Sequence, residues 1–287
     1  MNDTLATTES TGKIIPFIVL VFLAAIPVWL FAALTAPLIP EGMPINHLGF
    51  LAVFVPAIVA FILTCRKSGL KSAKELLGRS LDRGRIPRKI WYLVAVYSVP
   101  VLYVSALVLL ILMGAPIPES ALPLVAAPIL FLLLFVFAAG EEIGWQGYLF
   151  DSLEKRWNAS TASVALGLLC SAWHFPLFLI QNPPGGLLWI AVQSMYIIAS
   201  RVLIAWVYNN TGKSVFAATV FHNMSNACTY ILPIYDVALG PVIITSLFII
   251  AAVAVTYFWG SETLSQFRFK KEENVKVTIH GKNYYGI

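Results

Sequence analysis

The chain has 287 residues, of which 59% are hydrophobic and 11% are charged, and its formal net charge is +5. A soluble domain carries about 25% charged residues, so the few charges here cannot cover the surface of a large soluble core. The composition therefore excludes an ordinary soluble protein and predicts one that crosses a membrane several times. The three cysteines are scattered and odd in number, which gives no basis for a disulfide framework or a cysteine zinc site.

Long apolar runs predict the helical spans. A bilayer core about 30 Å thick requires about 20 apolar residues per helix. The first run is too long for the apolar part of a signal peptide and is followed by Pro37, so we interpret it as a retained span. The fourth run is expected to continue as an amphipathic helix to about Arg156. The sequence thus predicts an all-α polytopic membrane protein with eight transmembrane helices, at about 14–36, 48–64, 90–114, 121–150, 160–181, 186–208, 213–233 and 239–259.

The distribution of Lys and Arg predicts the orientation of these helices. All but one of the 19 basic residues precede the first span, follow the second, fourth or sixth, or lie in the C-terminal tail. The alternate loops, at 37–47, 115–120, 182–185 and 234–238, contain no Lys or Arg. The positive-inside rule then places both termini in the cytoplasm, for a multi-pass protein of the plasma or inner cell membrane. Orientation and contact with anionic lipids explain the basic charge, so nucleic acid is not an expected partner.

The basic loop 65–89 contains an amphipathic stretch. Residues 69–83 read G-L-K-S-A-K-E-L-L-G-R-S-L-D-R, with leucines near helical spacing. This pattern predicts a helix on the cytoplasmic face of the membrane. The alternative is a solvated basic loop.

Five ionisable residues fall within the predicted spans, namely Glu141, Glu142, His174, Arg201 and His222. An ionisable group at bilayer depth costs several kcal/mol unless it is paired or faces a water-filled cavity, so each of them marks a candidate functional site. At about 1.5 Å per helical residue from the nearest cytoplasmic marker, Glu141 and His174 lie about 21 Å deep and His222 about 14 Å deep. Three spans therefore bring a carboxylate and two imidazoles to similar depth.

Helical spacing indicates which side chains share a face. Glu142 and Gln146 are four residues apart and share a face, so Gln146 is expected to support Glu142. His222 and Asn226 are also four residues apart, and they can present two hydrogen-bond donors to one point. A carboxylate beside an imidazole can take a proton from water, and two donors can stabilise an oxyanion as it forms. These groups predict hydrolysis of a peptide bond without a covalent intermediate. Trp145, Trp173, Trp189 and Trp206 are expected to pack or to lie at the membrane interface.

The sequence resembles the CPBP (Abi) family of intramembrane proteases, relatives of the CAAX prenyl proteases and of bacteriocin-processing and self-immunity proteins. The motifs that carry the resemblance are E-E-I-G-W-Q-G-Y-L, W-H-F-P-L-F and W-V-Y-N-N-T-G-K-S-V-F-A-A-T-V-F-H-N-M-S-N. They define a catalytic core at 120–233, which comprises spans four to seven. It is preceded by N-terminal spans with their basic loop at 1–119 and followed by the last span and a basic tail at 234–287.

The resemblance implies a glutamate-dependent endopeptidase that acts on a membrane-associated peptide or protein and uses no cofactor. Glu141 would activate water with help from His174, and His222 and Asn226 would form the oxyanion hole. Glu142 would have a structural or orienting role.

The chain departs from the family pattern in two places. The family often has E-E-x-x-x-R, but Gln146 stands where that Arg would be, so Arg201 is predicted to pair with Glu142 or Glu141 instead. Cys170 replaces a family Phe four residues before His174, which is expected to alter packing only.

Other functions remain open at the level of the sequence. Glu141, His174 and His222 could bind zinc as two histidines and one carboxylate, although no H-E-x-x-H motif is present. The acids could form only a structural ion pair with Arg201, and a thiol mechanism at Cys170 is a further alternative. A transporter or a non-catalytic immunity protein could also use intramembrane ionisable groups on the same fold.

Overall fold

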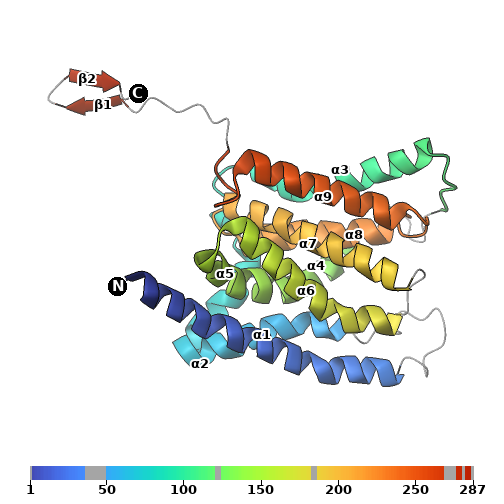
Figure 1. The fold of residues 1–287 in the computed structure, drawn as a ribbon, viewed down its shortest axis with the longest axis horizontal. Helices are drawn as coiled ribbons and strands as arrows, with labels where there is room; N and C mark the ends of the chain where they lie inside the picture. The colour runs from blue at the N-terminus through green and yellow to red at the C-terminus, as the bar shows by residue number, and fades with distance from the viewer. Residues whose placement is uncertain are drawn as a thin grey trace.

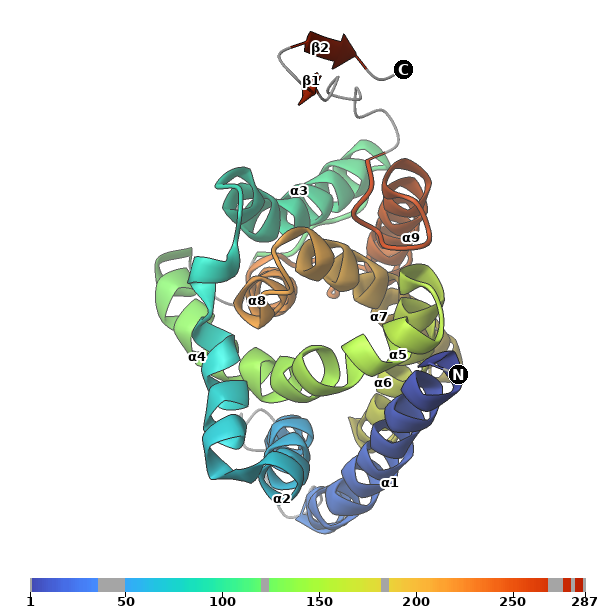
Figure 2. The ribbon, with the colours of Figure 1, turned by 90° about the vertical axis from the view of Figure 1, so that its left-hand side faces the viewer.

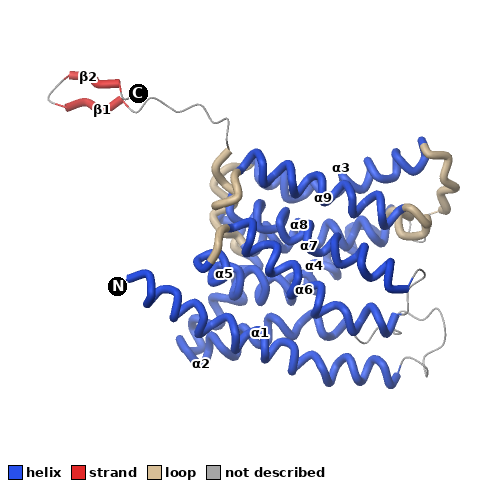
Figure 3. Tube along the Cα trace, in the orientation of Figure 1, coloured by secondary structure: helices blue, strands red, loops and turns tan. Residues whose placement is uncertain are grey.

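The structure, a computed structural model, describes residues 2–35, 50–119, 124–181, 186–267, 276–279 and 282–285. Long helices that run side by side make up almost all of this part of the chain (Figures 1 and 3). The helices are α1 Asn2–Thr35, α2 Val55–Gly78, α3 Ile90–Leu112, α4 Ala127–Gly144, α5 Asp151–Arg156, α6 Ala159–Gln181, α7 Gly186–Asn210, α8 Val215–Ile231 and α9 Gly240–Trp259. Shorter segments are the 3-10 turns η3 Arg79–Leu81, η4 Arg83–Arg85 and η5 Leu124–Ala126 and the π-helix η6 Trp145–Phe150.

Seven helical segments of the described residues are long and apolar enough to cross a membrane. This finding confirms a multi-pass, predominantly helical membrane protein. The seventh predicted span, 213–233, is also a helix, α8, but its 17 residues correspond to only about 26 Å, and His222 and Asn226 make it more polar than the others. Figure 2 shows α8 inside the bundle, beside α3, α4 and α7. Neighbouring helices therefore surround α8.

The N-terminal part of the chain is more helical than predicted. The first helix begins at Asn2, twelve residues before the predicted start at 14. Helix α2 extends from Val55 to Gly78 with one interruption at Gly69, whose φ of 83° favours glycine. Beyond Gly69 the helix runs across the ends of its neighbours, as Figure 2 shows. The amphipathic stretch 69–83 is thus helical as predicted, ending in 3-10 turns.

The all-α prediction misses a short antiparallel hairpin in the C-terminal tail. Strands β1 (Lys276–Ile279) and β2 (Lys282–Tyr285) pair with Lys276 opposite Tyr285. The stretch Val277–Ile279 is rich in β-branched residues, which favour strands. The apolar-run criterion used for the spans could not detect such a short element.

Two glycines of α4 control how closely α2 approaches the acidic pair. A Cβ atom on Gly144 would lie 2.5 Å from the backbone of Pro56, and one on Gly140 would lie 2.9 Å from the carbonyl oxygen of Val53. Small residues four apart permit such backbone contact between helices in membranes. Because the glycines flank the acids at 141 and 142, this contact fixes the part of α4 that carries them.

The chain enters and leaves the helical bundle on the same side. Figure 1 shows the start of α1 and the end of α9 at the same end of the bundle. This arrangement agrees with eight helices along the bundle, namely the seven candidate spans and α8.

Candidate active site

A cavity of about 440 Å³ lies within the bundle. Its walls come from α1, α4, α6, α7, α8 and the α8–α9 connection, together with residues just before α2. Five of the predicted site residues line it, namely Glu141, His174, Arg201, His222 and Asn226. The convergence predicted from depth along the spans is therefore present in the structure.

Glu142 lies behind the cavity wall and is the centre of a buried ionic cluster. Arg201 Nη1 donates to both carboxylate oxygens of Glu142, at 2.7 and 2.9 Å, and His222 Nδ1 lies 2.7 Å from Oε1. Glu142 is fully buried and Arg201 is 3% exposed, so each charge depends on the other for compensation. The predicted pairing of Arg201 is thus observed. The contact at Nδ1 also orients His222 so that Nε2 is the nitrogen left for the cavity.

Glu141 has very different surroundings, although it is the adjacent residue. Its Oε2 atom is buried and has no hydrogen-bond partner among the described residues. Oε2 lies 3.6 Å from Arg201 Nη2 and 4.0 Å from His174 Nε2. His174 Nδ1 lies 2.8 Å from the carbonyl oxygen of Cys170. A carbonyl oxygen can only accept, so this contact assigns the proton of a neutral imidazole to Nδ1 and leaves Nε2 as an acceptor facing Glu141.

The helix changes type immediately after the acidic pair. The π-helix η6 runs from Trp145 to Phe150, and π-helical turns inside α-helices are frequent at functional sites. Gln146 is fully buried in this segment, and neither of its amide atoms has a partner within the described residues. It therefore makes no hydrogen bond to Glu142, contrary to the support expected from α-helical spacing. Hydrogen bonds of the i→i+5 type change which residues share a face, and this explains the difference.

Two comparisons with known proteins bear on this site. Residues 123–228 match a family model described as type II CAAX prenyl endopeptidase Rce1-like. The chain is also 28% identical, over 225 residues, to CAAX prenyl protease 2 of Methanococcus maripaludis, with 71% of this chain and 79% of that protein covered. By both comparisons the chain is similar to the CAAX prenyl proteases. The resemblance that the three motifs predicted is thereby confirmed, and the matched residues include the cavity positions from Glu141 to Asn226.

Helix α8 presents one polar face to the cavity. His222, Ser225, Asn226 and Thr229 all line it and follow the spacing of a helical face. Asn223 points elsewhere, because its Nδ2 donates to the carbonyl oxygen of Phe131 at 2.9 Å. His222, Ser225 and Asn226 therefore face the cavity, and Asn223 does not.

Aromatic side chains form much of the remaining wall. Trp29 and Trp173 meet edge to face with ring centroids 5.9 Å apart, and Trp189 contacts Phe178 at 5.4 Å. All four line the cavity. Trp173 and Trp189 pack against other rings, as expected, and also form part of the cavity wall.

Sequence reasoning also missed polar cavity residues contributed by α7 and by the α8–α9 connection. Gln193, Tyr196 and Tyr235 line the cavity, and Tyr235 Oη lies 3.4 Å from Gln193 Oε1. A signal was present for one of them, because Gln193 lies eight residues before Arg201 and so near the same face of a helix. Tyr196 and Tyr235 gave no comparable signal.

The side chains of this site do not fit a resident metal ion in the observed arrangement. No group of three or more His, Cys, Asp and Glu side chains within the described ranges is placed to hold one. The guanidinium of Arg201 lies beside both acids, so positive charge already occupies their surroundings. His222 directs Nδ1 to Glu142, and His174 directs Nδ1 to a backbone carbonyl.

Proposed function

We propose that the protein is an intramembrane endopeptidase, which hydrolyses a peptide bond of a membrane-associated peptide or protein with a water molecule activated by Glu141. One observation carries this proposal. Glu141 presents an unpartnered carboxylate oxygen at a cavity wall, 4.0 Å from the unprotonated nitrogen of His174. A buried acceptor pair of this kind is what a general base for water requires.

The separation of the two acceptors suits a shared water molecule. Glu141 Oε2 and His174 Nε2 are too far apart for a direct hydrogen bond, yet one water can donate a hydrogen to each. A lone pair of that water then points away from both acceptors, toward a carbonyl carbon in the cavity. Glu141 takes the proton as the bond to carbon forms, and His174 keeps the water oriented. When the tetrahedral intermediate collapses, the C–N bond breaks and Glu141 passes this proton to the leaving amine nitrogen. Arg201 compensates the negative charge of Glu141.

His222 and Asn226 act as the oxyanion hole in this mechanism. Both line the cavity one turn apart on α8. The contact of Nδ1 with the carboxylate of Glu142 fixes the ring of His222, so Nε2 is the nitrogen that can donate into the cavity. The amide of Asn226 supplies the second donor. Two donors fixed before the reaction stabilise the charge that develops on the carbonyl oxygen.

The match to a CAAX prenyl protease favours a substrate anchored at the membrane. The aromatic wall of the cavity suits apolar groups of a peptide. Peptides with and without a prenyl group, otherwise identical, distinguish a lipid-dependent enzyme from one that recognises the peptide alone.

We also propose that both termini and the helical segment after Gly69 face the cytoplasm. Leu70, Leu77 and Leu81 of that segment are exposed beside lysines, which suits contact with anionic lipids of the plasma or inner membrane. In a Cys65→Ser background, a membrane-impermeant thiol reagent should label Lys74→Cys only after permeabilisation of intact cells. Labelling of intact cells would contradict this orientation.

The proposed activity is tested with purified protein and quenched fluorescent peptides. Glu141→Gln should lower kcat by roughly 10²- to 10⁴-fold while the protein still folds, because Oε2 makes no hydrogen bond to the described residues. The matched control is Glu75→Gln, the same change at an exposed site on α2. Exhaustive chelation should leave cleavage unchanged. Full activity of Glu141→Gln would contradict the proposal, and loss on chelation that zinc restores would favour a metalloprotease.

A further inference from the structure

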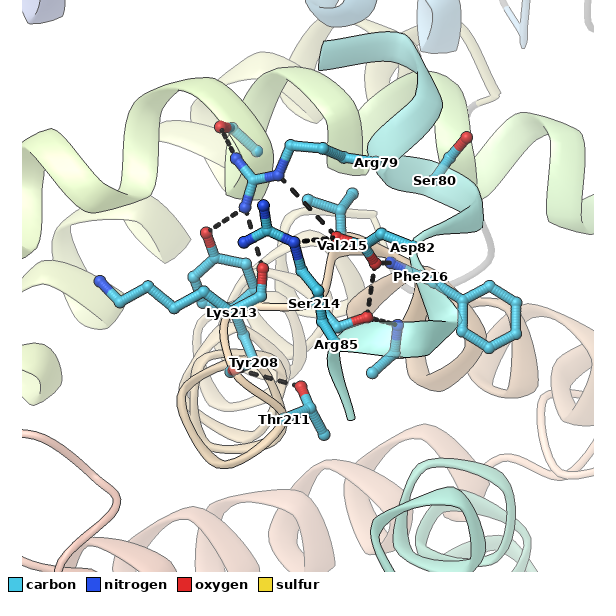
Figure 4. A network of polar contacts seen from close by, with 12 residues as sticks. Arg79, Ser80, Asp82, Arg85, Tyr208, Thr211, Lys213, Ser214, Val215 and Phe216 are labelled. Carbon is cyan, nitrogen blue, oxygen red and sulfur yellow. Dashed lines mark hydrogen bonds and ion pairs between the residues drawn. The ribbon is translucent and has the colours of Figure 1, made fainter. Parts of the chain in front are cut away.

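A second polar cluster lies at the ends of the helices, outside the cavity (Figure 4). It joins the segment that follows α2 to η6 and to the turn between α7 and α8. We propose that Arg79 and Asp82 of this cluster are positioning residues for the reaction: they hold α8, which carries His222 and Asn226, against the segment that follows the acidic pair. This inference rests on the proposed function of those two residues as the oxyanion hole.

Arg79 links three separate parts of the chain. Its Nη1 donates to the carbonyl oxygen of Gly147 at 2.7 Å, and its Nη2 donates to Tyr208 Oη at 2.8 Å and to the carbonyl oxygen of Lys213 at 2.9 Å. Gly147 belongs to η6, Tyr208 to α7, and Lys213 to the α7–α8 turn. A guanidinium can make these contacts together because its donors are fixed in one plane. The side chain is only 20% exposed, so these contacts are partly shielded from water.

Asp82 holds the first turn of α8. Its Oδ1 accepts hydrogen bonds from Ser214 Oγ at 2.6 Å and from the backbone N–H of Phe216 at 3.1 Å. Ser214 is the N-cap residue, and its Oγ accepts from the N–H of Ala217 at 3.2 Å. The first N–H groups of a helix have no acceptor within the helix. Asp82 and Ser214 therefore determine where α8 begins.

The turn before α8 is tightly confined. A Cβ atom on Gly212, whose φ is +66°, would lie 2.7 Å from the carbonyl oxygen of Arg85. On the other side, Lys213 Nζ lies 2.8 Å from Asp151 and 2.7 Å from Glu154, both on α5. Burial alone lowers the pKa of Lys213, but these hydrogen bonds raise it overall, so the ammonium stays charged near neutral pH. The turn thus has contacts on both sides that resist movement.

A displacement at this end of α8 reaches the cavity directly. His222 lies seven residues after Val215, about 10 Å along the helix, and Asn226 lies about 16 Å along it. A helix of this length moves as one body, so a shift of its start shifts both donors. A misplacement of about 1 Å can lower a rate by roughly 10²-fold. The contacts of Arg79 and Asp82 therefore affect the geometry of the oxyanion hole without touching the substrate.

The test begins with three variants assayed on the same peptide. Asp82→Ala should lower kcat by roughly 10- to 100-fold and change KM by less than about twofold, after correction for the folded fraction. Asp82→Asn keeps an oxygen acceptor for Ser214 and Phe216 and should recover activity to within about threefold of the parent. Arg83→Ala, which removes one exposed charge from the same segment, is the control and should behave as the parent.

A double-mutant cycle with Asn226→Ala separates positioning from general damage. If Asp82 acts through α8, adding Asp82→Ala to Asn226→Ala should lower kcat by less than about threefold further. The inference would be overturned if the kcat losses of the two single variants multiplied in full in the double variant. A normal kcat for Asp82→Ala would overturn it as well. A normal kcat for Asn226→Ala would instead refute the oxyanion hole itself. If Asp82→Ala does not fold, Arg79→Gln enters the same cycle with the same expectations.

Discussion

The cavity and the polar cluster at the helix ends use similar residues in opposite ways. At the helix ends, Arg79, Asp82 and Lys213 each contact two or more partners. At the cavity wall, Glu141 keeps an oxygen without a hydrogen-bond partner among the described residues. Charged groups that hydrogen-bond to several elements hold those elements together, whereas a buried carboxylate oxygen that lies at a cavity wall without a hydrogen bond is available for chemistry.

The same contrast separates the two adjacent acids. Glu142 is bound by Arg201 and His222, so we expect it to contribute to folding and to the orientation of His222. Glu141 lies at the cavity wall, where we propose that its Oε2 activates water. Adjacent positions on a helix point about 100° apart, and this is how one sequence motif supplies both roles.

Arg201→Leu should have the largest effect of the variants considered, because it removes the compensating charge from both acids. Loss of one partner of a buried ion pair costs about 3–5 kcal/mol, so little folded protein should be recovered from the membrane. The double variant Arg201→Leu/Glu142→Leu removes the pair together and should restore the folded yield, measured by size-exclusion chromatography in detergent. A normal yield for Arg201→Leu alone would show that water compensates Glu142.

Asn226→Ala tests the difference between a cavity residue and a packing residue on the same helix, α8. Loss of one oxyanion donor should lower kcat by roughly 10²- to 10³-fold, and the thermal midpoint should change little because Asn226 faces the cavity. Asn223→Ala is the matched control on α8. It removes the hydrogen bond to the Phe131 carbonyl and should lower stability by about 1 kcal/mol while kcat stays near the parent value. The opposite pattern would place the donor at Asn223.

The sequence was sufficient to predict most helices and the members of the site. Apolar runs of sufficient length identify spans because the bilayer fixes their minimum length. Ionisable residues inside those runs are costly, so Glu141, His174, Arg201 and His222 stood out, and depth along the spans predicted their meeting. The pairing of Arg201 with Glu142 followed from the missing cation at position 146.

Other features depend on contacts between residues far apart in the chain. Arg79 is 68 residues from Gly147 and 134 from Lys213, so the sequence showed only a basic loop that orientation already explained. The π-helix at Trp145 is likewise not visible in the pattern of apolar residues, and it changed the surroundings of Gln146. The polar cavity residues on α7 were hidden in an otherwise ordinary apolar helix.

Gln146 gives the smallest expected effect and tests whether a buried polar group without partners always marks function. Its amide has no hydrogen-bond partner within the described residues and does not line the cavity. A buried amide without partners costs about 1–3 kcal/mol, so Gln146→Leu should raise the unfolding midpoint, followed by tryptophan fluorescence, without lowering kcat. Gln146→Arg, the residue of the family pattern, should destabilise the protein because Arg201 already compensates Glu142. A lower midpoint for Gln146→Leu would mean that water satisfies this amide, and Gln146 would then join Glu141 as a polar group kept for the site.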